Sequence, residues 1–587
     1  MSKQIRIAAS SFAVLAVVVL AIAIGHKTTT VNAGPAEHAS GAPAPNAGGG
    51  AVPCNTTKSA AKQEICGTST DSARWWNAAG VGTFMGAGSA SWSIEKPIFF
   101  PPDSAYTHFA IPKGDEKYAA LSGDRIKGYI WDITGISRKS RDDGNQYWGR
   151  LTGSEYDHMT DDYVAAQLKR VGVQDVHIQK FNLSPQWWPT HWEVSVSGGG
   201  KTVELESAWP HSAQPCSNET CTIDAKGTEG KTWDLEPVWV GLGTPLDFKG
   251  KDVKGKAVLI YSVPTPGGEG YSAGWSGAVE RARDAGAAVV FTILGFPGNH
   301  VNHGGGTPES AKLTFGLGMD DADTIREMME KDEKPVVHVN ESVELRAGLT
   351  TGSVWGTLPG TTDENIVIMA HTEAPMQGAM DNASGIGTMI ELAQYYASMP
   401  QSQRKRTITF LTTSAHHTPA PNAGIQWVRK HYDFSKTALI VNCEHTAGLV
   451  LDPVGSSLVG TNVIAPRRFF MQGSDDLKAL VTKTFVDYGV GVDSPPSPVA
   501  GGELSTLVGM APGFHILDDI GYHTDMDIPQ YVPDAGLESV VRAYAKIIDE
   551  TNNMSLESLR VNMGTPATNR WTPAIESEDA GLIPVPK

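Results

Sequence analysis

The sequence predicts an α/β fold in which a mostly parallel sheet is covered by helices on both faces. Short, uninterrupted apolar runs are typical of buried parallel strands, and the last third of the chain contains four of them: 365–370, 406–413, 437–443 and 513–519. Between the first two runs, apolar residues from Ile386 to Ala393 recur at helical spacing. Strand, helix and strand in this order predict parallel neighbours joined by a helix that crosses back over the sheet.

The rest of the chain contains further elements, and its 587 residues are enough for two or three domains. Helices are predicted at 117–137 and 156–172, because apolar residues recur there every three and four positions. Strands are predicted at 175–181 and 191–198, where apolar and polar residues alternate. From 237 to 350, strand, helix and strand with Gly-rich connections indicate a separate, smaller α/β module.

The charge of the chain bears on its partners. The formal net charge is −17, and no run of Lys and Arg is longer than the one from Arg404 to Arg406. Because binding to a phosphate backbone normally needs a basic stripe, this composition disfavours a nucleic-acid partner.

The N-terminus has the pattern of a targeting segment. Lys3 and Arg6 precede an apolar stretch from Ile7 to Gly25, and the following residues suit a signal-peptidase cut before Gly34. The stretch has about 19 residues, barely enough to span a bilayer as a helix, so an uncleaved membrane anchor stays open as an alternative. Both alternatives place the rest of the chain outside the cytoplasm, either in the periplasm or secreted.

Cysteine usage agrees with export. Four of the five cysteines fall into close pairs, Cys54 with Cys66 and Cys216 with Cys221, as expected for small disulfide loops in an oxidising compartment. The fifth cysteine, Cys443, has no other cysteine near it in the sequence. The alternative is that all five are reduced and have no role in stability.

Polar residues with metal-binding chemistry follow the ends of the four apolar runs. In parallel sheets, ligands gather beyond the carboxyl ends of the strands. Imidazole and carboxylate are the ligands that zinc takes when one position must stay open, and a carboxylate can bridge two ions. The residues predicted to meet at this rim are His371, Asp381, His416, His417, Glu444 and His523.

Four segments together resemble the co-catalytic zinc aminopeptidase family, which also includes glutamate carboxypeptidases. They are AHTEAPMQGAMDNASG, KRTITFLTTSAHH, ALIVNCEHTAG and GYHTDMDIPQYV, in this order. The earlier segment WVGLGTPLDFKGKDVKGKAVLIYS resembles the protease-associated domain often inserted ahead of the first metal ligand. The resemblance implies a phosphorylase-like α/β fold, a zinc-dependent peptidase activity and two zinc ions, with a single ion as the alternative because this chain departs from the family pattern.

The predicted organisation combines the pattern of elements with this resemblance. It comprises a signal peptide or membrane anchor (1–33), an Ala/Gly/Pro-rich linker (34–70), an N-terminal extension with the first part of the catalytic domain (71–236), a protease-associated domain (237–350), the metallopeptidase catalytic domain (351–560) and a C-terminal tail (561–587).

Carried over from the family, the metal ligands divide between two ions. His371 and Glu444 would join the bridging Asp381 on the first ion. His417 and His523 would join Asp381 on the second ion. Glu373 stands where the family has an aspartate that orients the first histidine, a role that the longer side chain can fill.

The departure lies at His416 and His417, where the family has two consecutive glutamates, a general base and a metal ligand. Neutral imidazole is a routine zinc ligand, so His417 can replace the second glutamate. His416 is predicted to be the general base, with its pKa pushed below the usual value by two nearby cations. Losing a ligand carboxylate also raises the cost of binding the second ion, so a single-metal state is credible.

The predicted function is an exported, zinc-dependent hydrolase that cleaves peptide or similar amide bonds and is aminopeptidase-like. The alternative is an inactive relative that serves as a binding or structural module. Tyr522 is predicted to contact substrate, either helping to hold a tetrahedral intermediate or forming the pocket wall. The sequence leaves the substrate, the end-specificity and the oligomeric state open.

Three further predictions concern residues near these motifs and in the inserted region. His445 follows Glu444 directly, so the period of two along an extended chain predicts that its side chain points away from the metals and packs. His300 and His303 are predicted to be solvated residues of a Gly-rich turn, with contact to a ligand as the alternative. The segment 182–192, NLSPQWWPTHW, is either a rigid exposed turn or a wall of the substrate pocket.

Overall fold

A computed structural model of the chain was used for the structural description. The structure describes residues 98–183, 185–211, 231–262, 277–303, 313–417, 423–454, 457–493, 495–496, 502–517 and 521–564. Several predicted features lie outside these residues: the signal peptide or anchor (1–33), the linker (34–70), the paired cysteines Cys54, Cys66, Cys216 and Cys221, and the tail beyond residue 564. Cys443 is described, and it is a buried free cysteine.

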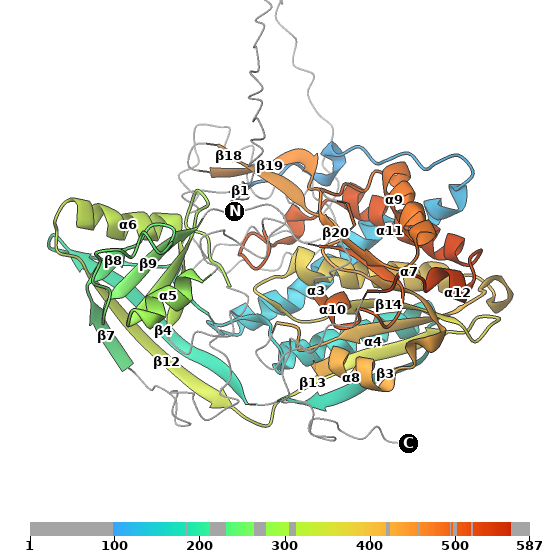
Figure 1. Ribbon diagram of the computed structural model, residues 1–587, viewed down its shortest axis with the longest axis horizontal. Helices are drawn as coiled ribbons and strands as arrows, with labels where there is room; N and C mark the ends of the chain where they lie inside the picture. The colour runs from blue at the N-terminus through green and yellow to red at the C-terminus, as the bar shows by residue number, and fades with distance from the viewer. Residues whose placement is uncertain are drawn as a thin grey trace, which may run out of the picture. The chain divides into compact units, whose positions relative to one another are not determined.

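The largest sheet of the described residues has seven strands in the order β20-β21-β17-β14-β16-β13-β3. Figure 1 labels four strands of this sheet: β20, β14, β13 and β3. Its strands are β3 (Gln174–Asn182), β13 (Thr350–Leu358), β14 (Asn365–His371), β16 (Thr407–Thr413), β17 (Thr437–Asn442), β20 (Arg468–Gln472) and β21 (Gly513–Leu517). Neighbours among β21, β17, β14 and β16 are parallel, whereas β20, β13 and β3 pair antiparallel. The α/β fold is confirmed. The sheet is mixed, and the four apolar runs predicted from the sequence form its parallel centre.

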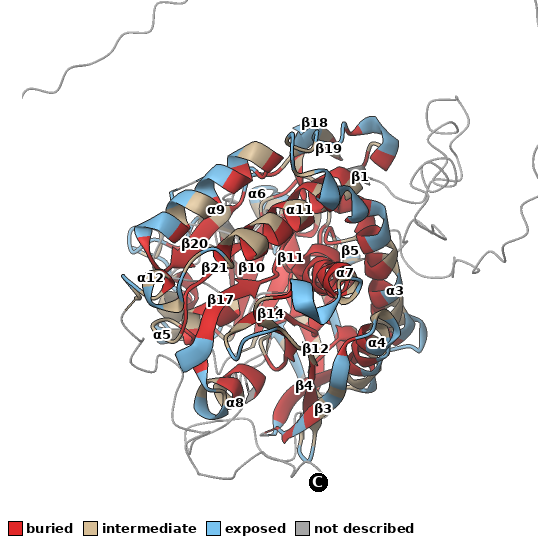
Figure 2. Cartoon of the chain, turned by 90° about the vertical axis from the view of Figure 1, so that its right-hand side faces the viewer, coloured by how far each residue is buried: buried red, intermediate tan, exposed pale blue. Residues whose placement is uncertain are grey.

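Side chains of β14 alternate between two apolar cores. Ile366, Ile368 and Ala370 belong to the larger core, which also takes residues from the five longest helices of the described residues: α3 (Gly123–Asp142), α4 (Glu155–Val171), α7 (Gly385–Ala397), α9 (Asp475–Tyr488) and α11 (Asp534–Thr551). Val367 and Met369 belong to the opposite core with α8 (Ala423–His431) and α10 (Gly502–Thr506). Full burial of each aliphatic side chain contributes about 1.5–3 kcal/mol. The central strands are accordingly buried between helices (Figure 2).

The first two helices have clear start and stop signals. The Ser154 side chain accepts a hydrogen bond from the Asp157 N–H at the start of α4, and Gly172 ends this helix at φ 98°, which favours glycine. The helix predicted over 117–137 is divided into a 3-10 turn, η3 (Glu116–Ala120), and α3. The division occurs because Ser122 is extended and caps α3 by accepting from the Arg125 N–H.

The region from 186 to 346 holds two further sheets. One has the order β6-β11-β10-β9-β8 and the other β5-β4-β12-β7. Their strands are β4 (Gln186–Gly198), β5 (Lys201–Glu204), β6 (Trp209–Pro210), β7 (Lys231–Leu235), β8 (Pro237–Trp239), β9 (Ala257–Ser262), β10 (Val289–Leu294), β11 (Thr314–Gly318) and β12 (Val336–Arg346), with α5 (Ala278–Asp284) and α6 (Met319–Glu330). Strands β4 to β7 precede position 237, the predicted start of the inserted domain, but they share its sheets.

Smaller elements complete the described residues. They are β1 (Ile98–Phe99), β2 (Gly149–Arg150), β15 (Ala374–Pro375), β18 (Leu449–Val454), β19 (Ser457–Ile464), η2 (Asp103–Ala105), η5 (Ala379–Ser384), η6 (Gln401–Gln403), η7 (Phe434–Lys436), η8 (Pro529–Tyr531) and α12 (Leu556–Leu559). None of the helices in the described part of the chain combines the length and apolar character needed to cross a membrane.

Candidate metal centre

The ends of the four parallel strands deliver the predicted residues to one cluster. His371 is the last residue of β14, and His416 and His417 follow β16. Glu444 follows β17 and His523 follows β21, while Asp381 lies in η5 just before α7. Close contacts join all six side chains, and four of them are almost fully buried: His371, Asp381, Glu444 and His523.

Asp381 lies at the centre of this cluster. Its Oδ1 is 2.8 Å from His371 Nε2, and its Oδ2 is 3.3 Å from His417 Nε2 and 3.2 Å from His523 Nε2. Burial by itself would raise the pKa of Asp381, but His417 and other nearby histidines hold it well below its usual value. Asp381 is therefore a carboxylate surrounded by imidazoles.

Three atoms around Asp381 fit a bound cation. Asp381 Oδ2, His417 Nε2 and His523 Nε2 are buried and have no hydrogen-bond partner. Leaving buried polar atoms unpaired is costly, and one carboxylate with two imidazoles is an ordinary zinc ligand set. Burial lowers the pKa of His417 and His523, so both rings stay neutral, the form that binds metal.

Glu444 faces a second group of residues. Its Oε2 accepts hydrogen bonds from Asn442 Nδ2 at 2.9 Å and His515 Nδ1 at 3.1 Å. Its Oε1 lies 3.7 Å from His371 Nε2 and 3.9 Å from His416 Nε2. Although burial opposes ionisation, His515 and other histidines lower the pKa of Glu444 to about 2.

Glu503, which was not among the residues predicted from the sequence, completes this second group. It is fully buried on α10, and its Oε1 lies 3.4 Å from His416 Nδ1 and accepts a hydrogen bond from the Thr413 hydroxyl. A five-residue helix preceded by Pro and Gly residues has no apolar period that would have marked it. His515 was also missed, because it lies inside an apolar strand.

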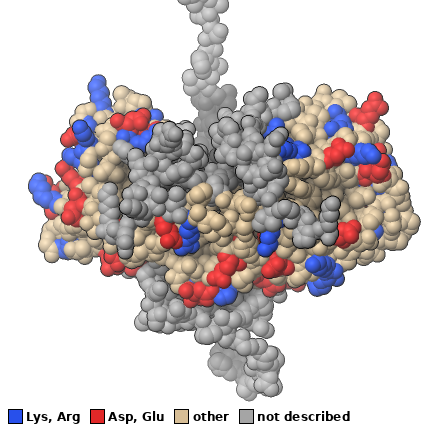
Figure 3. Space-filling model, turned by 90° about the horizontal axis from the view of Figure 1, so that it is seen from below, with Lys and Arg blue, Asp and Glu red and all other residues tan. Residues whose placement is uncertain are grey.

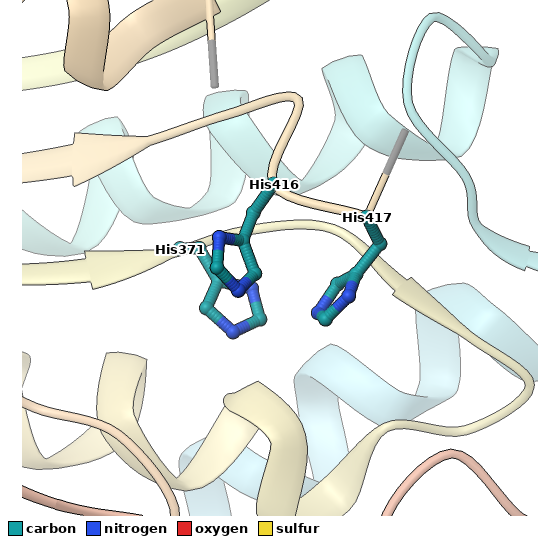
Figure 4. Close-up of side chains that lie close together, drawn as sticks. All are labelled: His371, His416 and His417. Carbon is teal, nitrogen blue, oxygen red and sulfur yellow. The ribbon is translucent and has the colours of Figure 1, made fainter. Parts of the chain in front are cut away.

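His416 and His417 point to different parts of the cluster (Figure 4). The His416 ring stacks on His371 with centroids 4.8 Å apart and 27° between planes, whereas His417 meets His371 edge-on at 75°. Their main-chain N–H groups both donate to Glu373 Oε1. The two adjacent histidines therefore have different neighbours: His416 lies beside Glu444 and Glu503, whereas His417 lies beside Asp381.

The role predicted for Glu373 is wrong in detail. Its carboxylate holds the main chain of the His416–His417 loop, whereas His371 Nδ1 is hydrogen-bonded to the main-chain carbonyl of Glu373 at 3.1 Å. Residue 373 still orients His371, but through an atom that any residue type would supply.

The prediction that His445 points away from the metals is also wrong. His445 Nε2 lies 3.0 Å from Asp381 Oδ1. The period-of-two argument fails because His445 has φ 45° and the chain turns there. The ring of Tyr522 lies 5.2 Å from that of His445 and 6.3 Å from that of His417, which puts Tyr522 at the wall of the cluster.

The prediction of solvated histidines in the 300–303 segment is wrong as well. His300 and His303 are buried. The N–H of His303 donates to the His523 carbonyl at 2.8 Å, and its Nδ1 accepts from Trp209 Nε1 at 3.1 Å. This segment of the inserted region therefore holds the turn that carries His523.

A small pocket adjoins His417. Its lining is largely apolar or uncharged: Tyr147, Leu151, Thr152, Gln186, Trp187, Trp188, His303, Glu373, Ala374, Pro375 and His417. Trp187 and Trp188 are both more than nine-tenths buried, so residues 186–188 form a wall of the pocket and are not an exposed turn. On the face drawn in Figure 3, basic and acidic side chains of the described residues are interspersed.

The sheet brings imidazoles and carboxylates together beyond the ends of its parallel strands, and these are the ligand types of catalytic zinc sites. Residues 353–448 match the model of Peptidase family M28, and the match includes every predicted ligand except His523. No curated protein sequence is significantly similar to the chain.

Solved structures share the fold. A Peptidase M28 precursor from Shewanella amazonensis SB2B is 18% identical, with a TM-score of 0.54 over 76% of this chain and 100% of the other. A zinc aminopeptidase from Bacillus subtilis is 15% identical, with a TM-score of 0.50 over 75% of this chain and 98% of the other. The family match supports a zinc metallopeptidase, and the solved structures share its fold.

Proposed function

We propose that the protein is an exported, zinc-dependent hydrolase of peptide or similar amide bonds with aminopeptidase-like chemistry. The observation that carries this proposal is the set of unpartnered buried atoms on Asp381, His417 and His523, beside a pocket that His417 also lines. In the proposal these three residues hold one zinc ion. Three protein ligands leave a fourth position open, as catalytic zinc sites require.

When bound there, zinc polarises the amide carbonyl and makes a water molecule more acidic. Asp381 supplies the one negative charge of the ligand set, and its main-chain N–H donates to Asp527 Oδ2 at 3.1 Å. Asp527 also accepts the Met380 N–H at 2.6 Å. These hydrogen bonds fix the loop that presents Asp381, which is the orienting role of outer residues in metal sites.

His416 is the proton acceptor in this proposal. Its ring lies beside His371 and against Glu444 and Glu503. In the metal-free chain burial lowers its pKa, but Glu503 and Glu444 outweigh burial and raise it. The ring takes the proton of the attacking water and returns it to the leaving amine. Unchanged turnover of aminoacyl and peptidyl amides by His416→Ala would remove this role.

The substrate in the proposal is a peptide or small amide whose side chain enters the aromatic pocket. Tyr147, Trp187 and Trp188 supply flat apolar surface there, and the Glu373 carboxylate is held by two main-chain N–H groups. Tyr522, at the wall of the cluster, contacts the substrate. Apolar pockets with few polar groups are typical of small-ligand sites.

The proposal also covers the N-terminus and the inserted region. Lys3, Arg6 and the apolar stretch that follows support export, either with cleavage or with the segment kept as an anchor. The strand order β11-β10-β9-β8, all parallel, supports a separate α/β module in the inserted region, which we assign to a protease-associated domain.

The test is elemental analysis of the purified mature chain together with a broad screen of amide substrates. The proposal expects zinc bound to the chain and hydrolysis that disappears on chelation and returns with zinc. A folded, metal-free chain that hydrolyses none of the amides would instead favour the inactive binding or structural module.

A further inference from the structure

His303 connects the inserted region to the candidate metal centre. Its main-chain N–H donates to the carbonyl of His523 at 2.8 Å, and the neighbouring residues Asn302 and Thr524 form an antiparallel bridge. The ring of His303 lies edge-on to the ring of His523, with centroids 5.8 Å apart and 75° between planes. Main-chain contacts therefore fix His303 beside one of the proposed metal ligands.

Two aromatic side chains also pack against the ring of His303. The Tyr147 ring lies 5.8 Å away between centroids, and the Trp209 ring lies 6.5 Å away at 73°. His303 is almost fully buried. A polar atom on a ring held in this way is oriented before any ligand arrives, so it needs no reorganisation during a reaction.

The hydrogen bond with Trp209 determines which nitrogen of His303 carries the proton. Trp209 Nε1 lies 3.1 Å from His303 Nδ1, and an indole N–H can donate a hydrogen bond but cannot accept one. Nδ1 is therefore the acceptor and carries no proton. The imidazole is neutral, with its proton on Nε2.

Nε2 of His303 is consequently a hydrogen-bond donor beside the metal centre. Among the residues that the structure describes, no group accepts from it, and the bond with Trp209 is the one hydrogen bond of the ring. His303 and His417 line the same pocket. A ligand that binds in this pocket can therefore accept a hydrogen bond from Nε2.

We infer that His303 is a further catalytic residue, whose Nε2–H donates to the carbonyl oxygen of the amide that is hydrolysed. The inference rests on the proposed function, in which the reacting amide lies against His417 and His523. His303 packs on His523 and shares the pocket lining with His417, so an amide in this place also lies next to the His303 ring.

This hydrogen bond becomes stronger as the reaction proceeds. When water adds to the carbonyl carbon, the π electrons of the C=O bond move to the oxygen, which becomes negatively charged. A donor that already faces this oxygen stabilises the new charge. The proton stays on Nε2 throughout, so the proton path through His416 to the leaving amine is unchanged. Because the bond is strongest in the transition state, its loss lowers kcat more than it raises KM.

Three substitutions of His303 separate the two ring nitrogens. His303→Phe keeps a flat ring and lacks both nitrogens. In His303→Asn the side-chain amide reaches the position of Nδ1, whereas in His303→Gln its N–H reaches the position of Nε2. We expect kcat for amide hydrolysis to fall about 100- to 1,000-fold in His303→Phe and His303→Asn, as when one oxyanion donor is removed, and His303→Gln to recover at least about 10-fold of this loss.

Zinc affinity distinguishes a catalytic role from support of the turn that carries His523. The main-chain N–H that binds the His523 carbonyl is present in every variant, so zinc affinity, measured by competition with a chromogenic chelator, should equal that of wild type. His338→Phe is the matched control, because His338 lies on β12 of the inserted region and outside the pocket lining. Its kcat should be unchanged, and circular dichroism reports whether each variant is folded.

A phosphinic dipeptide tests the contact without turnover. Its tetrahedral group carries a negatively charged oxygen, as the carbonyl does after water has added. Calorimetry should show that His303→Phe binds it about 10- to 100-fold more weakly than wild type, as expected when a hydrogen bond to a charged atom is lost. A crystal structure of the wild-type complex should place Nε2 within hydrogen-bond distance of this oxygen.

Four results would overturn the inference. They are an unchanged kcat in His303→Phe, equal kcat values in His303→Asn and His303→Gln, a loss of kcat that a loss of zinc affinity accompanies, and a complex in which Nε2 contacts no phosphinic oxygen. If the wild-type chain hydrolyses no amide, the proposed function fails, whereas the phosphinic complex still decides whether His303 donates to a ligand.

Discussion

The carboxylate of Glu373 accepts a hydrogen bond from the main-chain N–H of His417, 3.1 Å away, and also one from His416. Glu373 follows β14 and the two histidines follow β16, its parallel neighbour. One side chain therefore ties together the two strand ends that carry His371, His416 and His417. The shape of the centre depends on this link as well as on the ligands themselves.

Removing the link should loosen the histidine loop. In Glu373→Ala, both N–H groups lose their acceptor, at a cost of about 1–3 kcal/mol for each buried donor left unpaired. We expect zinc affinity and kcat/KM to fall about 10- to 100-fold, as for other outer partners of metal ligands. Glu373→Gln keeps an oxygen acceptor and should lose less. Equal losses in both variants would show that the hydrogen bonds are not the cause.

His417 tests the catalytic ion. His417→Ala removes one of three proposed ligands and should weaken the tightest zinc binding at least about 100-fold, because His523 and Asp381 alone form an incomplete set. Competition with a chromogenic chelator measures this affinity. His431→Ala is the control, because His431 is an exposed residue that stacks on Trp427. Wild-type zinc affinity in His417→Ala would exclude His417 as a ligand.

Trp187 tests the pocket. Its ring is buried and meets Tyr147 edge-on at 6.3 Å between centroids. Trp187→Ala should lower kcat/KM for amides with large apolar side chains by about 10-fold or more, since filling an apolar pocket contributes about 1–3 kcal/mol. Glycyl amides, which do not reach the wall, should change less. Trp239→Ala, at a tryptophan outside the pocket lining, serves as the control, and an equal loss for all substrates would argue against the pocket.

Glu341 predicts a pH dependence of stability away from the metal centre. Burial raises its pKa from 4.5 to about 8, so between these values the folded chain holds a proton that the unfolded chain has lost. The unfolded state then binds fewer protons, and stability falls with rising pH by about 1.4 kcal/mol per pH unit from this group.

In the variant Glu341→Gln, stability does not fall with rising pH for this reason, because a glutamine side chain has no proton to lose in this range. Its melting temperature should rise relative to wild type as the pH increases from 5 to 8, with the difference smallest at pH 5. The comparison cancels the titration of the histidines, which both proteins share. A difference that stays constant across this range would mean that Glu341 is not held protonated.

Continuous apolar runs made the centre of the fold predictable. Asn365–Ala370 and Thr437–Asn442 have the composition of strands buried on both faces, and the polar residue after each run lies at the rim. The positions of His371 and Glu444 at this rim therefore follow from the amino-acid pattern alone. The edge strands β20, β13 and β3 are antiparallel, which apolar runs alone do not determine.

Long-range approaches and local turns could not be predicted in the same way. Glu503 reaches His416 only because Gly502 lets a short helix lie on Glu444. His445 turns toward Asp381 because its backbone leaves the extended region. His303 is buried by contacts with Trp209 and the turn at His523, which are distant in the chain. No apolar periodicity and no short motif in the amino-acid sequence indicates any of these three contacts.

The central claim is that buried imidazoles and carboxylates hold a hydrolytic zinc ion. The most direct measurement is amide hydrolysis by the purified chain with its zinc content determined in parallel, before chelation, after chelation and after zinc is restored. The account predicts activity that is present with about one zinc ion per chain, lost with the metal and recovered with it. Hydrolysis that persists in a zinc-free chain, or a zinc-loaded folded chain that cleaves no amide, would contradict it.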